Sequence, residues 1–274
     1  MMKRNQAAVL FVPFVMLTCV WLGERPAQGQ GPGIKSEIVL IGTVHAPTSN
    51  FQEETLVRIL NRVRPDLILL ELDPSFFDSS FNLPEKYQGI SLESKAATSY
   101  AKTVGARLRP FDIEGRNKFY EVHDYFNREL KLNQEAGRLY AGGQLSPEAK
   151  VLFEALLSLS AVRDACGAER PEVINSSACD TAVEKKQYYA FKGLGRIIEL
   201  TPALKEMGPF WALADEFWVR RNGEMVRNIV RHSKELRPGR AVVLSGYEHR
   251  YYLRKQLAGQ AAREGFILRE YWDY

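Results

Sequence analysis

The chain has 274 residues, of which 45% are hydrophobic and 26% charged, a mixture that folds and is unlike that of a disordered tail. The net charge of +4 and the lack of a basic stripe argue against nucleic-acid binding. Three Cys exclude a disulfide-based scaffold, and four His are few enough to be weighed one by one.

Residues 1–29 have the pattern of a secretory signal peptide. Lys3 and Arg4 precede an uncharged apolar run over 7–22, and small residues come before the expected cleavage point after Gly29. We therefore expect an exported protein, periplasmic or secreted. The alternative is an uncleaved segment that associates with a membrane, although the run is short for a spanning helix.

The mature part, residues 30–274, is expected to form a single domain. Removing Lys3, Arg4, Glu24 and Arg25 leaves a net charge of only +2, so the leader accounts for much of the apparent basicity. Two cysteines remain, Cys166 and Cys179. In an oxidising compartment they can form one disulfide, and two free thiols are the alternative.

The first third of this domain alternates strands and helices. The pattern predicts buried strands over 38–42, 66–72 and 106–113, with helices over 53–63 and 91–104 between them. Continuous apolar strands separated by helices are typical of a parallel sheet with both faces covered.

The middle of the chain is predicted to be a helical insertion, from about residue 115 to 236. Helices are expected over 116–140, 146–162, 180–190 and 211–236, with Ser146 as an N-cap. His123 and His232 lie among charged residues of these helices and are expected on the surface.

The chain then returns to the sheet. A buried strand over 240–246 precedes a helix over 250–264 and a final edge strand over 266–274. The predicted fold class is therefore α/β, with a mostly parallel central sheet covered by helices. The helical insertion separates an N-terminal β-α-β-α-β unit from a C-terminal β-α-β unit.

Polar residues follow the ends of the predicted parallel strands. His45, Glu71 and Asp112 follow the first three strands, and Glu248 and His249 follow the strand after the insertion. Because parallel strands end at the same edge, where open α/β sheets bind ligands, we expect these side chains to converge. Imidazole nitrogens and carboxylate oxygens bind Zn, Mn or Co, and the same groups act as general acids and bases.

Two of these positions share a tetrapeptide pattern, Gly42-Thr-Val-His45 and Gly246-Tyr-Glu-His249. Each follows a buried strand, and the Gly lets the backbone bend or approach a neighbour closely. The pairing favours a functional role for both His. The alternative for each is a structural His that bonds a loop carbonyl.

The charged candidates also have structural alternatives. Glu71 follows four apolar residues and needs a partner if buried. Asp112 can instead cap a helix at Glu114, and Asp73 is expected to cap or turn the chain before a proline. Arg221 lies on an apolar helix face and is expected to be buried against a carboxylate, either structurally or within the site.

The chain resembles the TraB/PrgY/GumN–Tiki family. The resemblance rests on the two Gly-x-x-His motifs, on Glu71-Leu72 at a strand end, and on Arg221-Asn-Gly-Glu-Met225 in a helix. It implies a fold like that of the erythromycin-esterase and haem-uptake ChaN superfamily and, in the Tiki branch, a metal-dependent protease. Carried over by position, the site would consist of His45, Glu71, Arg221 and His249. The family's third strand often ends in Asp-Arg, whereas Asp112 is followed here by Ile113, which leaves Arg116 without a clear counterpart.

The leading hypothesis is an exported metal-dependent hydrolase, a peptidase of the TraB/Tiki type, acting on a peptide or a small ester. His45, Glu71 and His249 would hold a divalent Zn, Mn or Co ion that acidifies a bound water. Asp112 or Glu248 would serve as base, while Arg221 would position Glu71 or stabilise an oxyanion.

Two other functions stay open. One is metal-free, esterase-like hydrolysis with His45 as general base. The other is a non-enzymatic protein that binds a peptide, or haem through His45 or His249.

Overall fold

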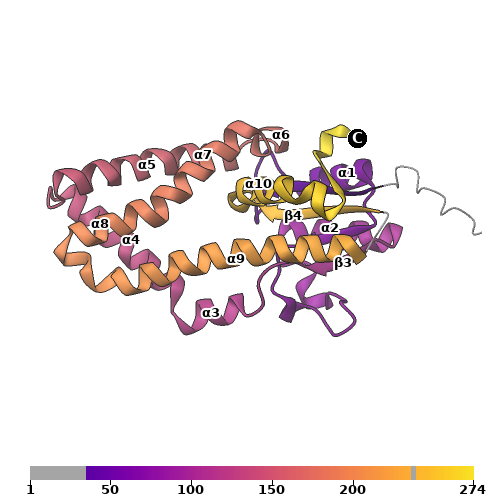
Figure 1. Ribbon diagram of the computed structural model, residues 1–274, viewed down its shortest axis with the longest axis horizontal. Helices are drawn as coiled ribbons and strands as arrows, with labels where there is room; N and C mark the ends of the chain where they lie inside the picture. The colour runs from indigo at the N-terminus through magenta and orange to yellow at the C-terminus, as the bar shows by residue number, and fades with distance from the viewer. Residues whose placement is uncertain (1–34, 236–238) are drawn as a thin grey trace, which may run out of the picture. The chain divides into compact units, whose positions relative to one another are not determined.

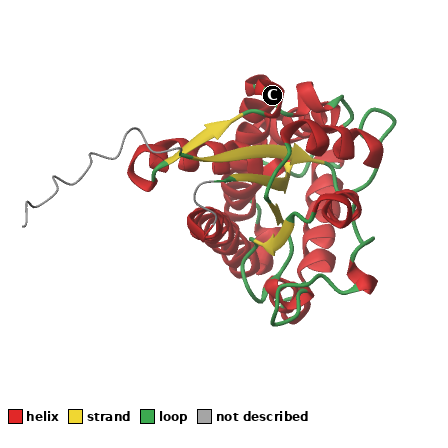
Figure 2. Ribbon diagram, turned by 90° about the vertical axis from the view of Figure 1, so that its right-hand side faces the viewer, coloured by secondary structure: helices red, strands yellow, loops and turns green. Residues whose placement is uncertain are grey.

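The fold is built on a sheet of five parallel strands within residues 35–235 and 239–274, the ranges that the computed structural model describes. The strands are β1 (Ser36–Thr43), β2 (Leu67–Leu70), β3 (Arg107–Pro110), β4 (Arg240–Gly246) and β5 (Phe266–Arg269). They lie in the order β3-β2-β4-β1-β5, and Figure 2 shows them side by side with helices around them. The prediction of an α/β fold with a mostly parallel sheet is confirmed, and β5 lies at an edge.

Helices cover both faces of the sheet, which is why its central strands are apolar throughout. Val39 and Ile41 of β1 pack with α1 (Glu53–Val63) and α2 (Leu92–Val104) on one face. The alternate residues of β1 lie in the core on the other face, which is closed by α9 (Gly208–Glu235) and α10 (Tyr247–Glu264). Successive strand residues point to opposite faces, so each face has its own core.

The insertion between β3 and β4 is helical, as predicted. Its α-helices are α3 (Arg116–Val122), α4 (Tyr125–Ala141), α5 (Pro147–Gly167), α6 (Pro171–Ile174), α7 (Ser177–Tyr188), α8 (Leu194–Leu200) and α9. Ser146 caps α5 as expected. The prediction of one helix over 116–140 is wrong, because Asp124 adopts a left-handed conformation, with φ of 47°, between α3 and α4.

One helix belongs to two cores. α9 has 28 residues, and its first half contributes Trp211 and Ala214 to the core of the insertion. Its second half contributes Met225 and Ile229 to the core against the sheet. Figure 1 shows α9 running from beside α8 and α4 to beneath the strands. The residues at its middle are thereby placed next to the carboxyl ends of the strands.

The C-terminal segment differs from its prediction in two respects. α10 begins at Tyr247, directly after β4, so that His249 lies in its first turn and not in a loop. The expected strand over 266–274 is only four residues long and is followed by a 3₁₀ turn, Tyr271–Asp273.

His232 is not the surface residue that its charged neighbours suggested. It is 2% exposed, near the end of α9, and its ring meets the edge of Phe81 at a centroid distance of 6.4 Å. Burial lowers the pKa of this imidazole. His123 is half-buried, with its ring 4.6 Å from that of Phe119.

The expected signal peptide, its cleavage point and the membrane-associated alternative all lie outside the described residues. Among the helices that are described, none is long and apolar enough to span a membrane.

Candidate active site

The carboxyl ends of β1, β2 and β4 surround a cavity of about 560 Å³. His45 follows β1, Glu71 follows β2, and His249 lies in the first turn of α10, and all three line the cavity. Because β1 and β4 are neighbours, with Thr43 paired to Gly246, the two Gly-x-x-His segments leave the sheet side by side. The structure thus brings together the three predicted side chains.

Arg221 holds Glu71 and Asp112 together at the bottom of this site. Its Nη2 lies 2.6 Å from Glu71 Oε1 and 2.8 Å from Asp112 Oδ2, and its Nε lies 2.8 Å from Asp112 Oδ1. Burial opposes the charge of Arg221, but Asp112 and Glu71 outweigh this effect and raise its pKa. A buried Arg paired with carboxylates is what the apolar spacing on α9 predicts.

Asp112 is fully engaged. Besides the two hydrogen bonds from Arg221, its carboxylate accepts one of 2.6 Å from Arg116 Nη1 and one of 2.8 Å from the Ile113 N–H. Asp112 is completely buried and is not among the described residues that line the cavity. It therefore positions Arg221 and Arg116, and its geometry does not suit the role of catalytic base that the sequence suggested.

Glu71 is held in one orientation by donors on both oxygens. Besides Arg221 on Oε1, Oε2 accepts hydrogen bonds from the Gly246 N–H at 2.7 Å and from Ser245 Oγ at 3.0 Å. Burial alone would raise the pKa of Glu71, but the positive groups around it and the Gly246 N–H lower the pKa well below its usual range. Glu71 is thus a fixed negative charge.

Gly246 is needed here because the space beside it is occupied. A Cβ at this position would lie 3.0 Å from His45 Nε2 and 3.5 Å from Glu71 Oε2. The absence of a side chain therefore lets the imidazole of the first motif approach the backbone of the second, which explains one of the two motif glycines.

His45 is the outer histidine, with 64% of its side chain exposed. Its Nδ1 lies 3.3 Å from Oε1 of Glu93, a buried residue in the first turn of α2 that also accepts a 2.5 Å hydrogen bond from Thr43 Oγ1. The hydrogen bond to Glu93 is the main cause that raises the pKa of His45 to about 9. The contact with Glu93 thus favours the protonated imidazole.

His249 is the inner histidine and has the opposite character. Asn222 Nδ2 donates to Trp218 O at 2.8 Å, so its Oδ1 faces His249 Nδ1, also at 2.8 Å, and accepts that N–H. The lone pair of the ring is then on Nε2, 3.4 Å from Glu71 Oε1. Burial lowers the pKa of His249 to about 4, against the opposing effect of Glu71. This imidazole is neutral at pH 7.

Two histidines that share the Gly-x-x-His pattern therefore line the same cavity as Glu71, and their pKa values are shifted in opposite directions. Pairs of groups whose environments separate their pKa values mark the acid and the base of a catalytic site. In this arrangement His45 can donate a proton and His249 can accept one. The sequence-based alternative had assigned His45 as the base.

Glu248 lines the same cavity but turns its carboxylate toward the insertion. Its Oε1 lies 2.5 Å from Arg163 Nη1, and its Oε2 accepts from Gln187 Nε2 at 2.5 Å and lies 3.7 Å from Lys186 Nζ. Both oxygens are occupied by groups outside the His45–Glu71–His249 cluster. The structure therefore does not bring Glu248 into position as the base.

The insertion supplies an aromatic wall, defined here as Tyr120, Phe126 and Trp218 from α3, α4 and α9. The Trp218 ring stacks on His249 at a centroid distance of 4.5 Å and an angle of 23°. Tyr120 Oη accepts from Arg221 Nη1 at 3.3 Å, and Phe126 is 63% exposed. The cavity thus has charged groups at the sheet and apolar rings opposite them.

Sequence reasoning missed Glu93 and gave no role to Asn222 or Trp218. Acidic residues are common in the first turn of any helix, so the position of Glu93 in the sequence does not indicate a role in a site. Asn222 could have been found, because it follows Arg221 in the motif and lies in the same turn of α9. Arg116, for which the sequence offered no counterpart, does contact Asp112.

The residues predicted to hold a divalent ion are paired with other groups in this structure. Both oxygens of Glu71 accept hydrogen bonds, one of them from a guanidinium, and His45 Nδ1 lies against Glu93. Three cationic groups offset three carboxylates: Arg116, Arg221 and His45 against Asp112, Glu71 and Glu93. Within 35–235 and 239–274, no group of three or more His, Cys, Asp or Glu side chains is arranged to hold a metal. The ion stays a prediction.

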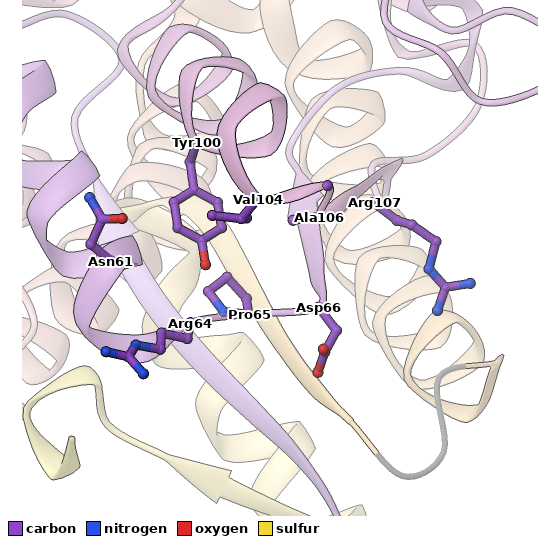
Figure 3. Close-up of a pocket in the computed structure, with 9 residues that line it drawn as sticks. Asn61, Arg64, Pro65, Asp66, Tyr100, Val104, Ala106 and Arg107 are labelled. Atoms are coloured by element: carbon purple, nitrogen blue, oxygen red, sulfur yellow. The ribbon is translucent and has the colours of Figure 1, made fainter.

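A second hollow lies at the opposite, amino end of β2 and β3. Its volume is about 780 Å³, and Figure 3 shows the Tyr100 ring with Arg64, Asp66 and Arg107 around it. The three charged residues are exposed, and Asp66 bonds the Arg240 N–H at 2.8 Å. No histidine lines this hollow, and its polar groups do not converge on a common point.

No family model, no curated protein and no solved structure matches the chain.

Proposed function

We propose that the protein is a hydrolase that adds water to the carbonyl carbon of an ester or amide, without a resident metal ion. The observation that carries this proposal is the pair of histidines in one cavity whose Nδ1 atoms have different partners, a carboxylate of Glu93 for His45 and the amide of Asn222 for His249. The resemblance to the TraB/PrgY/GumN–Tiki family, and through it to erythromycin esterases, points to the same class of reaction.

His249 is the proposed general base. Its bare Nε2 would accept a proton from water as the water oxygen attacks the carbonyl carbon. The imidazolium that forms lies 3.4 Å from Glu71 Oε1, which stabilises its charge. Arg221 and the Gly246 N–H keep Glu71 ionised, so the carboxylate does not itself take the proton.

His45 is the proposed general acid. Its protonated Nε2 side lies beside Gly246, at the same end of the cavity, and would donate to the leaving oxygen or nitrogen. Glu93 holds the ring by Nδ1 and supports its charge. One proton thus moves from water to His249 and another from His45 to the leaving group, and exchange with solvent restores both.

The test is the pH dependence of hydrolysis of a panel of aryl esters and peptides. We expect kcat/KM to rise through a pKa of about 4 and to fall through a pKa of about 9. His249→Gln should lower kcat/KM by about 10²–10⁴-fold. If His45 is instead the base, activity rises up to about pH 9 and the assignment of roles is wrong. If no member of the panel is hydrolysed, hydrolysis itself is not supported.

A metal-dependent hydrolase, the activity implied by the Tiki branch, is the second candidate. One observation favours it: a histidine held through Nδ1 by Asn222, with a bare Nε2 next to a carboxylate, is an arrangement that metal-ligating histidines use. His45, Glu71 and His249 are the residues that would hold the ion. More than about a tenth of an equivalent of Zn, Mn or Co in the purified protein, with activity lost to a chelator and restored by that metal, would establish this candidate over the first.

Export is part of the proposal, since residues 1–29 have the pattern of a signal peptide. Detection of a chain that begins after Gly29 in the periplasm or medium would support it, whereas a full-length chain in the membrane fraction would support the anchored alternative.

A further inference from the structure

Two thiols face each other outside the candidate active site. Cys166 lies in the last turn of α5 and is half-buried, and Cys179 lies in the first turn of α7 and is buried. Both are free, and burial together with the neighbouring Cys166 thiol raises the pKa of Cys179. The helices α5 and α7 pack against each other here, which makes the two thiols neighbours.

The segment between the two cysteines, residues 167–178, contacts the first Gly-x-x-His motif. Asn175 is 1% exposed, and its Oδ1 accepts from the Gly42 N–H at 2.6 Å while its Nδ2 donates to Gly42 O at 3.0 Å. Both backbone groups of the motif glycine are therefore bound to one side chain of this segment.

The same segment also contacts the second motif. Gly167 lies so close to Tyr247 that a Cβ at Gly167 would be 2.6 Å from Tyr247 Oη, and this hydroxyl donates to Arg163 O at 3.2 Å. Tyr247 lines the candidate active site two residues before His249. The segment 167–178 thus links the strand ends that carry both histidines.

We propose that Cys166 and Cys179 form a reversible disulfide, which fixes the segment 167–178 and through it the backbone of the two Gly-x-x-His motifs. The bond closes a loop of 14 residues, counting both cysteines. The proposal concerns the two cysteines and the contact of their segment with the two motifs. It does not depend on whether the candidate active site hydrolyses a carbonyl compound.

The oxidant is a small-molecule disulfide. The Cys166 thiolate, on the more accessible side, attacks one sulfur of that disulfide, which releases one thiolate and leaves a mixed disulfide on Cys166. Cys179 then attacks the Cys166 sulfur and releases the second thiol, which takes up the proton of Cys179. The two cysteines together lose two electrons and two protons, and the small disulfide is reduced to two thiols. Burial raises the pKa of Cys179, so the second step is the slower one.

The experiment uses the full chain carrying Cys19→Ser, equilibrated in mixtures of oxidised and reduced glutathione. We expect alkylation and mass spectrometry to find a linked Cys166–Cys179 peptide and no lasting glutathione adduct. Closing a loop of this length should raise the melting temperature by about 6–12 °C. Amide hydrogen exchange in peptides that cover Gly42–His45 and Gly246–His249 should slow by about fivefold.

Two variants separate the disulfide from its proposed effect. Cys179→Ser should retain a glutathione adduct on Cys166 and show no slower exchange at either motif. Cys166→Ser, at the less buried position, also cannot form the cross-link and should show no slower exchange, so it serves as the control if the other variant does not fold. A persistent adduct without a cross-link in the Cys19→Ser chain overturns the site, and a cross-link without slower exchange overturns the connection to the motifs.

Discussion

Each end of the sheet carries a cavity, and the two cavities differ in whether their charged side chains are exposed or buried. At the amino end the hollow is larger, about 780 Å³ against 560 Å³, but its charged side chains are exposed to solvent. At the carboxyl end the side chains of Glu71, Asp112 and Arg221 are no more than 8% exposed. Cavity volume alone would favour the amino end, whereas the convergence of buried charge favours the end with the histidines.

The difference has a structural cause. Where a parallel strand ends and a helix begins, backbone N–H groups are free to bind an anion, as Gly246 N–H binds Glu71 at the start of α10. Charges there can be buried because donors are already in place. At the amino end Arg64 and Arg107 have no such environment and remain in water, where a charge has little effect on a neighbour.

The largest effect should come from removing the central cation. Arg221→Met leaves Glu71 and Asp112 buried without their shared partner, and we expect it to lower the free energy of unfolding by about 3–5 kcal/mol. The matched change at the amino end, Arg107→Met, removes an exposed charge and should stay within about 0.5 kcal/mol. Urea denaturation of both variants measures the contrast, and equal losses at the two ends would contradict it.

A second, smaller effect should appear in acid stability. The pKa of His249 is about 4 in the folded protein and about 6.5 unfolded, so the unfolded chain binds more protons between these values. Wild type should therefore lose on the order of 2–3 kcal/mol of stability as the pH falls from 6.5 to 4. His249→Gln should lack this loss.

Urea titrations between pH 7 and pH 4.5 isolate the His249 contribution. Below pH 4.5 the lowered pKa of Glu71 adds a loss of its own, because stability that a depressed carboxyl provides disappears as the pH falls. A wild-type curve parallel to that of His249→Gln over the upper range would show that His249 is not held neutral.

The third effect concerns the outer histidine. Glu93→Gln removes the carboxylate that raises the pKa of His45, so the alkaline limb of kcat/KM should move from about 9 toward about 6.5. At pH 8 this makes the variant about 30-fold slower, whereas at pH 6 it should be nearly unaffected. An NMR titration of the His45 imidazole reads the same shift without turnover. If the alkaline decrease of kcat/KM stays at the same pH in Glu93→Gln, His45 is not the general acid.

The smallest effect should come from the aromatic wall. Phe126 is exposed, so Phe126→Ala should leave stability nearly unchanged but raise KM for substrates with an apolar group by about 3–10-fold. Val104→Ala at the amino-end hollow is the control and should change neither quantity. A loss in kcat with unchanged KM would mean that Phe126 does not contact the substrate.

Much of the candidate site could be predicted from the sequence, because two rules of local structure place its residues. Parallel strands end at one edge, which placed His45, Glu71 and His249 together, and the four-residue spacing of a helix placed Arg221 toward the core. Glu93 was not accessible, since its contact with His45 joins residues 48 positions apart through the packing of α2. For the same reason the buried position of His232 was missed, because Phe81 covers it from a distant loop.

The protonation states lay beyond the sequence altogether. The two Gly-x-x-His motifs read alike, but one imidazole has a carboxylate at Nδ1 and the other an amide. Only the fold distinguishes them, and the proposed roles differ for this reason from the metal-free alternative, in which His45 is the base.

The length of α9 places a strict condition on this protein. One continuous helix contributes Trp211 to the core of the insertion and Ile229 to the core of the sheet, with Arg221 between them. Successive side chains of an α-helix are rotated by about 100° around its axis. One residue inserted between Trp211 and Arg221 would therefore point either the guanidinium or the tryptophan out of its core. Substitutions along the exposed side of α9 should therefore be tolerated far more readily than any change in its number of residues.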